Sequence, residues 1–176
     1  RTFENSPIID VIIPAFNEEK AIGNVLAEIP SAWVREIVVV SNGSTDDTVA
    51  VAKAGGATVL LEPNRGYGRA CLKGMAHIAA KPVHDQPDIV VFLDGDYSDY
   101  PEELPTLVKP ILEENIDMVI GSRALGERER GAMQPQQIFG NWLATFLMKL
   151  FFRATFTDLG PFRAIKYEKL VALQME

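Results

Sequence analysis

Two aspartates stand two residues apart at the point where a wholly apolar run ends. Residues Ile89 to Leu93 are apolar, and Asp94-Gly95-Asp96 follows them directly. An extended backbone there points both carboxylates the same way, where they repel each other. A hard divalent cation would relieve that repulsion, and Mg²⁺ typically binds through one or two carboxylates together with phosphate oxygens. The spacing therefore predicts that Asp94 and Asp96 hold Mg²⁺ or Mn²⁺, while Gly95 leaves room for a ligand.

The acidic residues that follow this pair have a simpler explanation. Asp99 stands two residues before Pro101, which suits the first turn of a helix, and we expect Asp99 to cap that helix. Glu102 and Glu103 favour the positive end of a helix dipole. We assign helix initiation to these acidic residues and reserve ligand chemistry for the aspartate pair.

Polar turns also follow the first two apolar runs of the chain. Glu18 and Glu19 come after Pro14 and suit either a ligand site or the first turn of a helix. Ser41 and Asn42 can exchange hydrogen bonds with a base or ribose, although a plain turn explains Asn42 equally well. The four residues 44–47 begin with Ser44 and end with Asp47, and this spacing resembles a capping box.

A glycine-punctuated turn precedes a further helical pattern. Gly66 and Gly68 lie beside Arg69, so backbone amides there could approach a phosphate at the helix N-terminus. A plain glycine turn is the alternative. The spacing matches neither a dinucleotide-binding fingerprint nor a P-loop, so both are excluded.

Short apolar runs rich in valine and isoleucine predict the strands that position these turns. They lie at residues 8–13, 37–40, 58–61, 89–93 and 118–120. Apolar residues with three-four spacing predict helices at 22–29, 72–79 and 104–111. Alternating strands and helices indicate an α/β fold, with a doubly wound, mostly parallel sheet and helices on both faces. Ligands bind such sheets beyond the carboxyl ends of the strands, where the polar turns are expected.

Composition narrows the class of protein. The 176 residues are 47% hydrophobic and 23% charged, which predicts one domain over residues 1–176, truncated within a C-terminal helix. The formal net charge of −7 argues against nucleic-acid binding. The single cysteine, Cys71, excludes an internal disulfide and fits a reducing compartment, so we expect a cytoplasmic location. No apolar run is long enough to span a bilayer.

Taken in order, these stretches resemble the family 2 glycosyltransferases of the GT-A fold, a nucleotide-diphospho-sugar transferase-like fold. Within that family the chain is most similar to the polyprenyl-phosphate (dolichol-phosphate) mannosyl and glucosyl synthases. The matching stretches lie between residues 8 and 172 and read IIPAFNEE, VVSNGSTDDT, NRGYGRA, FLDGDYSDYPEEL and DMVIGSR. The resemblance implies that Pro14, Phe16 and Glu18 line a nucleotide pocket, and that Asn42 contacts the base or ribose.

The same resemblance implies that Asp94 and Asp96 hold the metal on the diphosphate, and that Arg123 faces the phosphates. The implied activity is inverting, metal-dependent transfer of a sugar from a nucleotide-diphosphate sugar, with a polyprenyl phosphate as the favoured acceptor. Two departures matter. The family's usual Asp-Asp is Ser41-Asn42 here, which leaves the base undetermined, and Ser98 replaces a glutamine that touches the metal in some relatives.

The acceptor side falls in the last third of the chain. Residues 124–137 are polar and charged, which suits either a solvated loop or a segment that closes over a substrate. In the second case Arg128 and Arg130 are expected to contact an acceptor phosphate. The amphipathic stretch 138–153 suits a membrane interface, and a core or homo-oligomer interface explains it equally well. That membrane would be contacted from its cytoplasmic face. Asp158 is the carboxylate best placed to act as a general base if the acceptor is a hydroxyl.

Three other functions are alternatives to transfer to a lipid phosphate. A saccharide or other hydroxyl acceptor is one, and a non-catalytic nucleotide-binding module is another. A nucleotidyltransferase should carry a glycine-rich, basic loop after the first strand, where this chain has Phe16-Asn17-Glu18-Glu19. The sequence therefore favours a glycosyltransferase.

Overall fold

The computed structural model describes residues 6–121, 154–157 and 163–174, and these form seven strands of one sheet. The strands are β1 (Ile9–Ala15), β2 (Glu36–Ser41), β3 (Thr58–Leu61), β4 (Ile89–Phe92), β5 (Met118–Gly121), β6 (Ala154–Thr157) and β7 (Arg163–Lys166). Their order is β3-β2-β1-β4-β7-β5-β6, and each neighbouring pair is parallel except those that involve β7. The predicted doubly wound, mostly parallel α/β sheet is confirmed.

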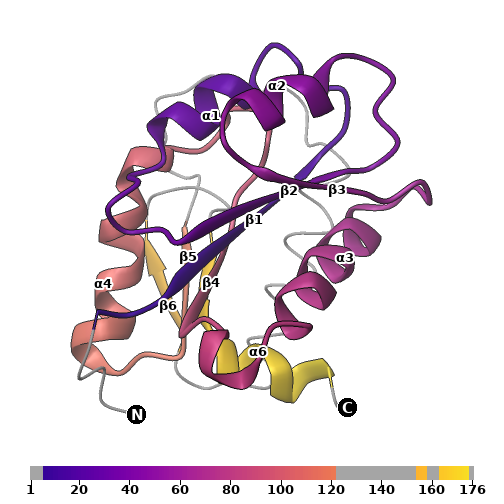
Figure 1. Ribbon diagram of the computed structural model, residues 1–176. Coiled ribbons are helices and arrows are strands. Elements are labelled where there is room, and N and C mark those ends of the chain that lie inside the picture. The colour runs from indigo at the N-terminus through magenta and orange to yellow at the C-terminus, as the bar shows by residue number, and fades with distance from the viewer. Residues whose placement is uncertain (1–5, 122–153, 158–162, 175–176) are drawn as a thin grey trace.

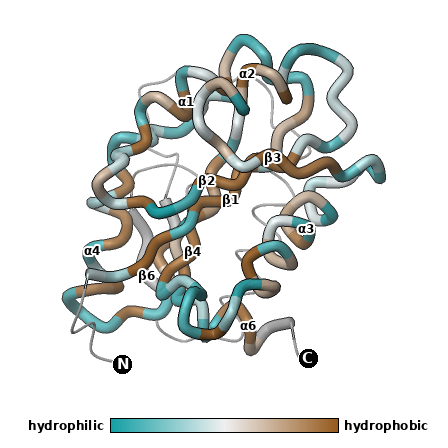
Figure 2. The backbone as a smooth tube through the Cα atoms, in the orientation of Figure 1, coloured by the Kyte–Doolittle hydropathy of each residue, from teal (hydrophilic) through white to brown (hydrophobic). Residues whose placement is uncertain are grey.

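Helices cover both faces of the sheet (Figure 1). They are α1 (Ile22–Glu28), α2 (Thr48–Ala54), α3 (Tyr67–Ala79), α4 (Leu104–Glu114) and α6 (Tyr167–Gln174), with short 3₁₀ turns η1 (Val83–Asp85) and η2 (Pro101–Glu103). Buried residues of α1, α2 and α4 pack on one face with Val11 and Ile13, and those of α3 and α6 pack on the other with Ile12. Burial on both faces explains the nearly continuous apolar runs of the strands, which only Asp10 interrupts in β1. Figure 2 shows hydrophilic residues gathered in the loops.

The order of the strands creates a switch point between β1 and β4. From β1 the chain winds outward through β2 and β3, then returns to β4 on the other side of β1. The carboxyl ends of β1, β2 and β4 therefore meet at one edge of the sheet, where ligands bind in folds of this kind. Because β7 runs antiparallel, its first residue, Arg163, also enters at this edge, opposite Phe92.

Helix α3 lies unusually close to the centre of the sheet. A Cβ atom added at Gly74 would stand 2.8 Å from Cγ2 of Ile12 on β1. Only glycine permits that approach, because no native side chain sits so near another carbon. The helix begins at Tyr67, five residues earlier than the predicted helix at 72–79, so Gly68 lies in its first turn.

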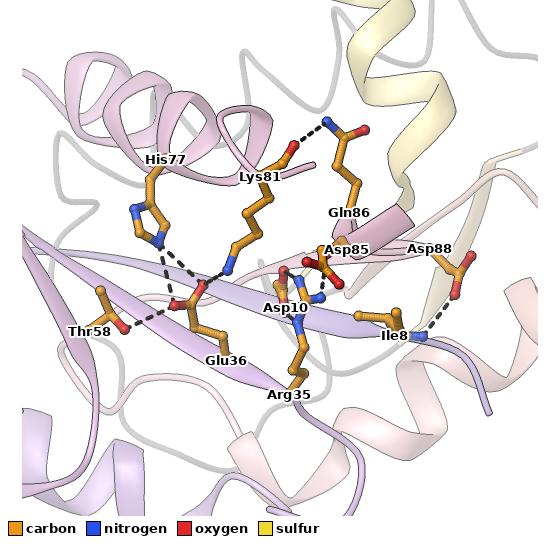
Figure 3. Close-up of polar contacts among 10 residues, drawn as sticks. All are labelled: Ile8, Asp10, Arg35, Glu36, Thr58, His77, Lys81, Asp85, Gln86 and Asp88. Carbon is orange, nitrogen blue, oxygen red and sulfur yellow. Dashed lines mark hydrogen bonds and ion pairs between the residues drawn. The ribbon is translucent and has the colours of Figure 1, made fainter. Parts of the chain in front are cut away.

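The opposite, amino edge of the sheet is held together by paired charges (Figure 3). Arg35 donates from Nε to Asp10 Oδ1 at 3.0 Å, and its other end reaches the carbonyl of Asp85. Glu36 accepts hydrogen bonds from Thr58, and its carboxylate lies 3.0 Å from Nζ of Lys81. These contacts join β1, β2, β3, η1 and the segment just after α3, far from the switch point. Among the described helices none is long and apolar enough to cross a membrane.

Candidate active site

The aspartate pair forms a tight turn directly after β4. Asp94 is 4% exposed and its backbone N–H donates to Oδ2 of Asp99 at 3.2 Å, while Asp96 is half-buried and accepts the N–H of Ser98 at 3.0 Å. Tyr97 takes a left-handed backbone conformation with φ of 64°, which turns the chain sharply. The interpretation of Asp99 as a helix cap is wrong. Its carboxylate accepts the N–H of Asp94 inside the turn, and neither η2 nor α4 has a side-chain hydrogen bond at its N-cap.

Gly95 serves a different purpose from the one that the sequence suggested. A Cβ atom there would lie 3.3 Å from Cβ of Ala15 and 3.4 Å from the carbonyl oxygen of Pro14. The space beside Gly95 is thus filled by the end of β1 and is not open to a ligand. The glycine lets the aspartate turn press against β1, which brings the carboxylates toward the loop that follows Pro14.

Negative charge accumulates where these two loops meet. Burial, with the nearby carboxylates of Asp96, Asp46 and Asp94, raises the pKa of Glu18 to about 7. Glu18 therefore senses carboxylates from the ends of both β2 and β4. Its own backbone N–H is held by Oγ1 of Thr48 at 2.8 Å, so the loop does not simply swing the side chain away.

Reciprocal hydrogen bonds lock the loop after β1 to the loop after β2. Oγ of Ser44 accepts the N–H of Asn17 at 3.1 Å, and Oδ1 of Asn17 accepts the N–H of Thr45 at 2.8 Å. Likewise Oε2 of Glu19 accepts the N–H of Asp47 at 3.1 Å. The predicted capping box is wrong, because Ser44 bonds across to the other loop and Asp47 caps α2 with no side-chain hydrogen bond.

The side chain of Asn42 is hydrogen-bonded to the protein's own backbone. It is 6% exposed, and its Nδ2 donates to the carbonyls of Glu62 at 3.0 Å and Asn64 at 2.8 Å. Its Oδ1 accepts the N–H of Gly66 at 2.9 Å. Asn42 therefore fastens the loop after β3 against the end of β2, and its predicted contact with a base or ribose remains a prediction.

That fastened loop places a cation over an aromatic ring. The guanidinium carbon of Arg65 stands 3.4 Å from the ring centroid of Phe16, whose side chain is 37% exposed. Such stacking is favourable by about 0.5–1 kcal/mol at an exposed site. Phe16 thus offers a flat face at the mouth of the site, and Arg65 rests on it.

Two residues that the sequence did not single out lie behind the aspartate pair. The hydroxyl of Tyr67 donates to Oδ1 of Asp94 at 2.8 Å. Burial, with the neighbouring Asp94, raises the pKa of Tyr67 well above its usual range, so the hydroxyl keeps its proton. Burial opposes the charge of Arg163, but Tyr67, Asp94 and Asp99 favour it and raise the pKa of the guanidinium. Cys71 lies in the same region, and burial raises its thiol pKa to about 12, which makes it unreactive.

The residues at this edge fit a divalent cation that is shared with a ligand. No group of three or more His, Cys, Asp or Glu side chains within residues 6–121, 154–157 and 163–174 is arranged to hold a metal alone. Asp94, Asp96 and Glu18, whose pKa is raised by burial and by nearby carboxylates, suit a cation whose remaining ligands are phosphate oxygens and water. Pro14, at the end of β1, lies beside this edge. Arg123, Arg128, Arg130, Asp158 and the stretch 138–153 lie outside the described residues.

The known proteins that this chain resembles are glycosyltransferases. Residues 10–171 match the family described as glycosyl transferase family 2. The chain is 34% identical over 166 residues to a protein of Mycobacterium tuberculosis named as a glycosyltransferase, covering 94% of this chain and 70% of that protein. It is 27% identical over 158 residues to the UDP-N-acetylglucosamine–dolichyl-phosphate N-acetylglucosaminyltransferase of Methanococcus voltae, covering 80% of this chain and 61% of that protein.

A solved structure agrees with these relatives. It is glucosyl-3-phosphoglycerate synthase from Mycobacterium tuberculosis in complex with Mn²⁺, UDP and glucosyl-3-phosphoglycerate. The TM-score is 0.62 at 29% sequence identity, over 92% of this chain. The chain spans 57% of the length of that structure's chain, so the similar enzyme is considerably longer.

Asn42→Asp should destabilise the protein by about 2–3 kcal/mol, because a carboxylate would lose two donors and face two carbonyl oxygens. Chemical denaturation measures the change. Asn24→Asp, the same substitution on the exposed side of α1, is the matched control and should change stability by less than about 0.5 kcal/mol. Equal stability of the two variants would contradict the role given to Asn42.

Glu18→Gln should stabilise the protein more at pH 8 than at pH 5. An ordinary glutamate releases its proton near 4.5 but folded Glu18 near 7, so the folded state binds the extra proton between these values. The free energy of unfolding therefore falls as pH rises through this window, and the penalty is complete above about pH 7. Urea denaturation from pH 5 to pH 8 measures the effect, and Glu114→Gln at the exposed end of α4 is the control. A pH-independent difference would contradict the charge crowding.

Proposed function

Because the chain belongs to glycosyl transferase family 2, we propose that it is the catalytic domain of a hexosyltransferase that uses a nucleotide-diphosphate sugar, with Mg²⁺ or Mn²⁺ and with inversion at the anomeric carbon. The observation that carries this proposal is the meeting of Glu18, Asp94 and Asp96 at the switch point between β1 and β4. Crowded carboxylates there would repel a diphosphate, so a cation must lie between them and the donor.

The donor would lie across the ends of β1, β2 and β4. The ring of Phe16, on which Arg65 stacks, would lie beside the base, with Pro14 and Glu18 nearby. Asn42 would contribute mainly by holding the loop that carries Arg65, because its side chain is already bonded to that loop. Arg123 would reach the phosphates from beyond β5.

Asp94 and Asp96 would hold the cation on the diphosphate. A bound divalent cation would neutralise the charge that develops on the departing nucleoside diphosphate. Asp96, half-buried and anchored by the N–H of Ser98, faces outward more than Asp94 does. The turn fixes both carboxylates before the donor arrives. The cation that they hold would then keep the diphosphate in place while the acceptor attacks in line from the far side of the sugar.

We favour a polyprenyl phosphate as the acceptor. A phosphate monoester is largely ionised at neutral pH and needs no general base, whereas a hydroxyl does. Two similar proteins are named for phosphate-bearing molecules, dolichyl phosphate in one and phosphoglycerate in the other, which supports a phosphate in the acceptor. Arg128 and Arg130 would bind it, and residues 138–153 would meet the cytoplasmic face of a membrane.

Asp96→Asn should abolish the gain in nucleotide affinity that Mn²⁺ provides, while it changes the free energy of unfolding by less than about 1 kcal/mol. Isothermal titration of UDP and GDP with and without Mn²⁺ measures this and also identifies the base. Asp85→Asn, at the amino edge, is the matched control. If Asp96→Asn keeps full Mn²⁺-dependent affinity, the metal assignment is wrong; a donor-hydrolysis screen of the unaltered chain tests catalysis itself.

Asp158→Asn distinguishes the two kinds of acceptor. With a lipid phosphate most of the turnover should remain, and neutralising Arg128 and Arg130 should weaken use of the acceptor. With a hydroxyl acceptor the substitution should lower the rate by about two to four orders of magnitude. Transfer assays with a short-chain polyprenyl phosphate measure both variants. Loss of turnover in Asp158→Asn with donor binding intact would overturn the choice of a phosphate.

A further inference from the structure

Asp94 is held from behind by side chains that come from distant parts of the chain. Tyr67, the first residue of α3, donates its hydroxyl to Oδ1 at 2.8 Å, and Asp99 accepts the backbone N–H of Asp94 at 3.2 Å. With 4% of its surface exposed, Asp94 has little freedom to rotate. One of its two carboxylate oxygens is therefore committed to a protein donor.

The tyrosine is itself firmly positioned. Helix α3 is pressed against β1 at Gly74, where no larger residue would fit. The residue before the tyrosine, Gly66, has φ of 143° and its N–H is held by Oδ1 of Asn42. The start of α3 is thus fixed from both directions along the chain, so the hydroxyl of Tyr67 cannot drift away from Asp94 without unpacking the helix.

A buried cation supports the arrangement. Arg163 is 2% exposed and is the first residue of β7. It pairs with Phe92, which precedes Asp94 by two residues in the chain. It lies close enough to Tyr67, Asp94 and Asp99 to interact with all three, and it hydrogen-bonds Tyr67. A guanidinium in this position offsets the charge of the two buried aspartates, which would otherwise be very costly to bury.

We propose that Tyr67, supported by Arg163, restricts Asp94 to a single coordinating oxygen and so makes the site prefer Mn²⁺ or Mg²⁺ over Ca²⁺. Ca²⁺ takes six to eight oxygens and often both oxygens of one carboxylate, whereas Mg²⁺ takes six in a regular octahedron and keeps several waters. An oxygen that accepts a tyrosine hydroxyl at 2.8 Å is a poor second ligand for a large cation. Tyr67 is a positioning residue, and the inference rests on the proposed metal role of Asp94.

Tyr67→Phe tests this, because it removes the hydroxyl and keeps the ring. Titration calorimetry with Mn²⁺ and with Ca²⁺, each alone and then with UDP or GDP, gives the ratio Kd(Ca²⁺)/Kd(Mn²⁺), which is high when the site prefers Mn²⁺. We expect the ratio Kd(Ca²⁺)/Kd(Mn²⁺) to fall about tenfold, because the freed Oδ1 gives Ca²⁺ a second carboxylate oxygen while Mn²⁺ loses the positioning of its ligand. Tyr167→Phe, the same substitution at the amino edge of the sheet, is the control and should leave the ratio unchanged.

The outcomes separate the inference from the function on which it rests. If Mn²⁺ and Ca²⁺ weaken equally, or if neither changes, Tyr67 does not set selectivity and the inference is overturned. If the unaltered chain binds no Mn²⁺ under any of these conditions, the metal role of Asp94 fails and the inference fails with it. Near-ultraviolet circular dichroism of Tyr67→Phe shows whether the fold is kept. Should that variant unfold, Arg163→Lys, which retains the charge but not the shape of the group, must lower the same ratio for the inference to stand.

Discussion

The crowding of like charges at the carboxyl edge of the sheet is the constraint on which the rest of this structure depends. Glu18, Asp46, Asp94 and Asp96 come from three different loops, and burial together with the charge of the three aspartates raises the pKa of Glu18. Such a cluster opposes folding unless something holds the loops in place. The structure supplies backbone-to-side-chain hydrogen bonds between loops at the surface and the buried Arg163 beneath them.

The two edges of the sheet therefore differ in how their charges are arranged. At the amino edge opposite charges are matched, as in Asp10 with Arg35 and Glu36 with Lys81 (Figure 3), and these pairs stabilise the packing of β1, β2 and α3. At the carboxyl edge charges of one sign are left to face a ligand. This division follows the general rule that functional sites are less stable than the framework that carries them.

Much of the fold could be predicted from the sequence because its signals are local. Apolar runs gave β1 to β5 within two residues, and helical spacing gave α1, α3 and α4. The sequence does not reveal contacts between residues that are distant in the chain. Ser44 looks like a helix cap but bonds to Asn17 in another loop. Asn42, whose ligand contact stays a prediction, bonds to the backbone of Glu62, Asn64 and Gly66. Arg163 carries no periodic or motif signal, and only the antiparallel insertion of β7 gives it a place behind Asp94.

That insertion also decides the order in which the sheet can be completed. β7 is the strand that joins β3-β2-β1-β4 to β5-β6, and its pairing with β4 links residues more than seventy positions apart. The connections among β1, β2, β3 and β4 are shorter than the connection from β4 to β7, so closing them costs less chain entropy. During synthesis, the nascent chain would thus carry an aspartate turn without its buried counter-charge until Arg163 emerges. The buried counter-charge of the site is therefore in place only where β7 has paired with β4 and closed the sheet.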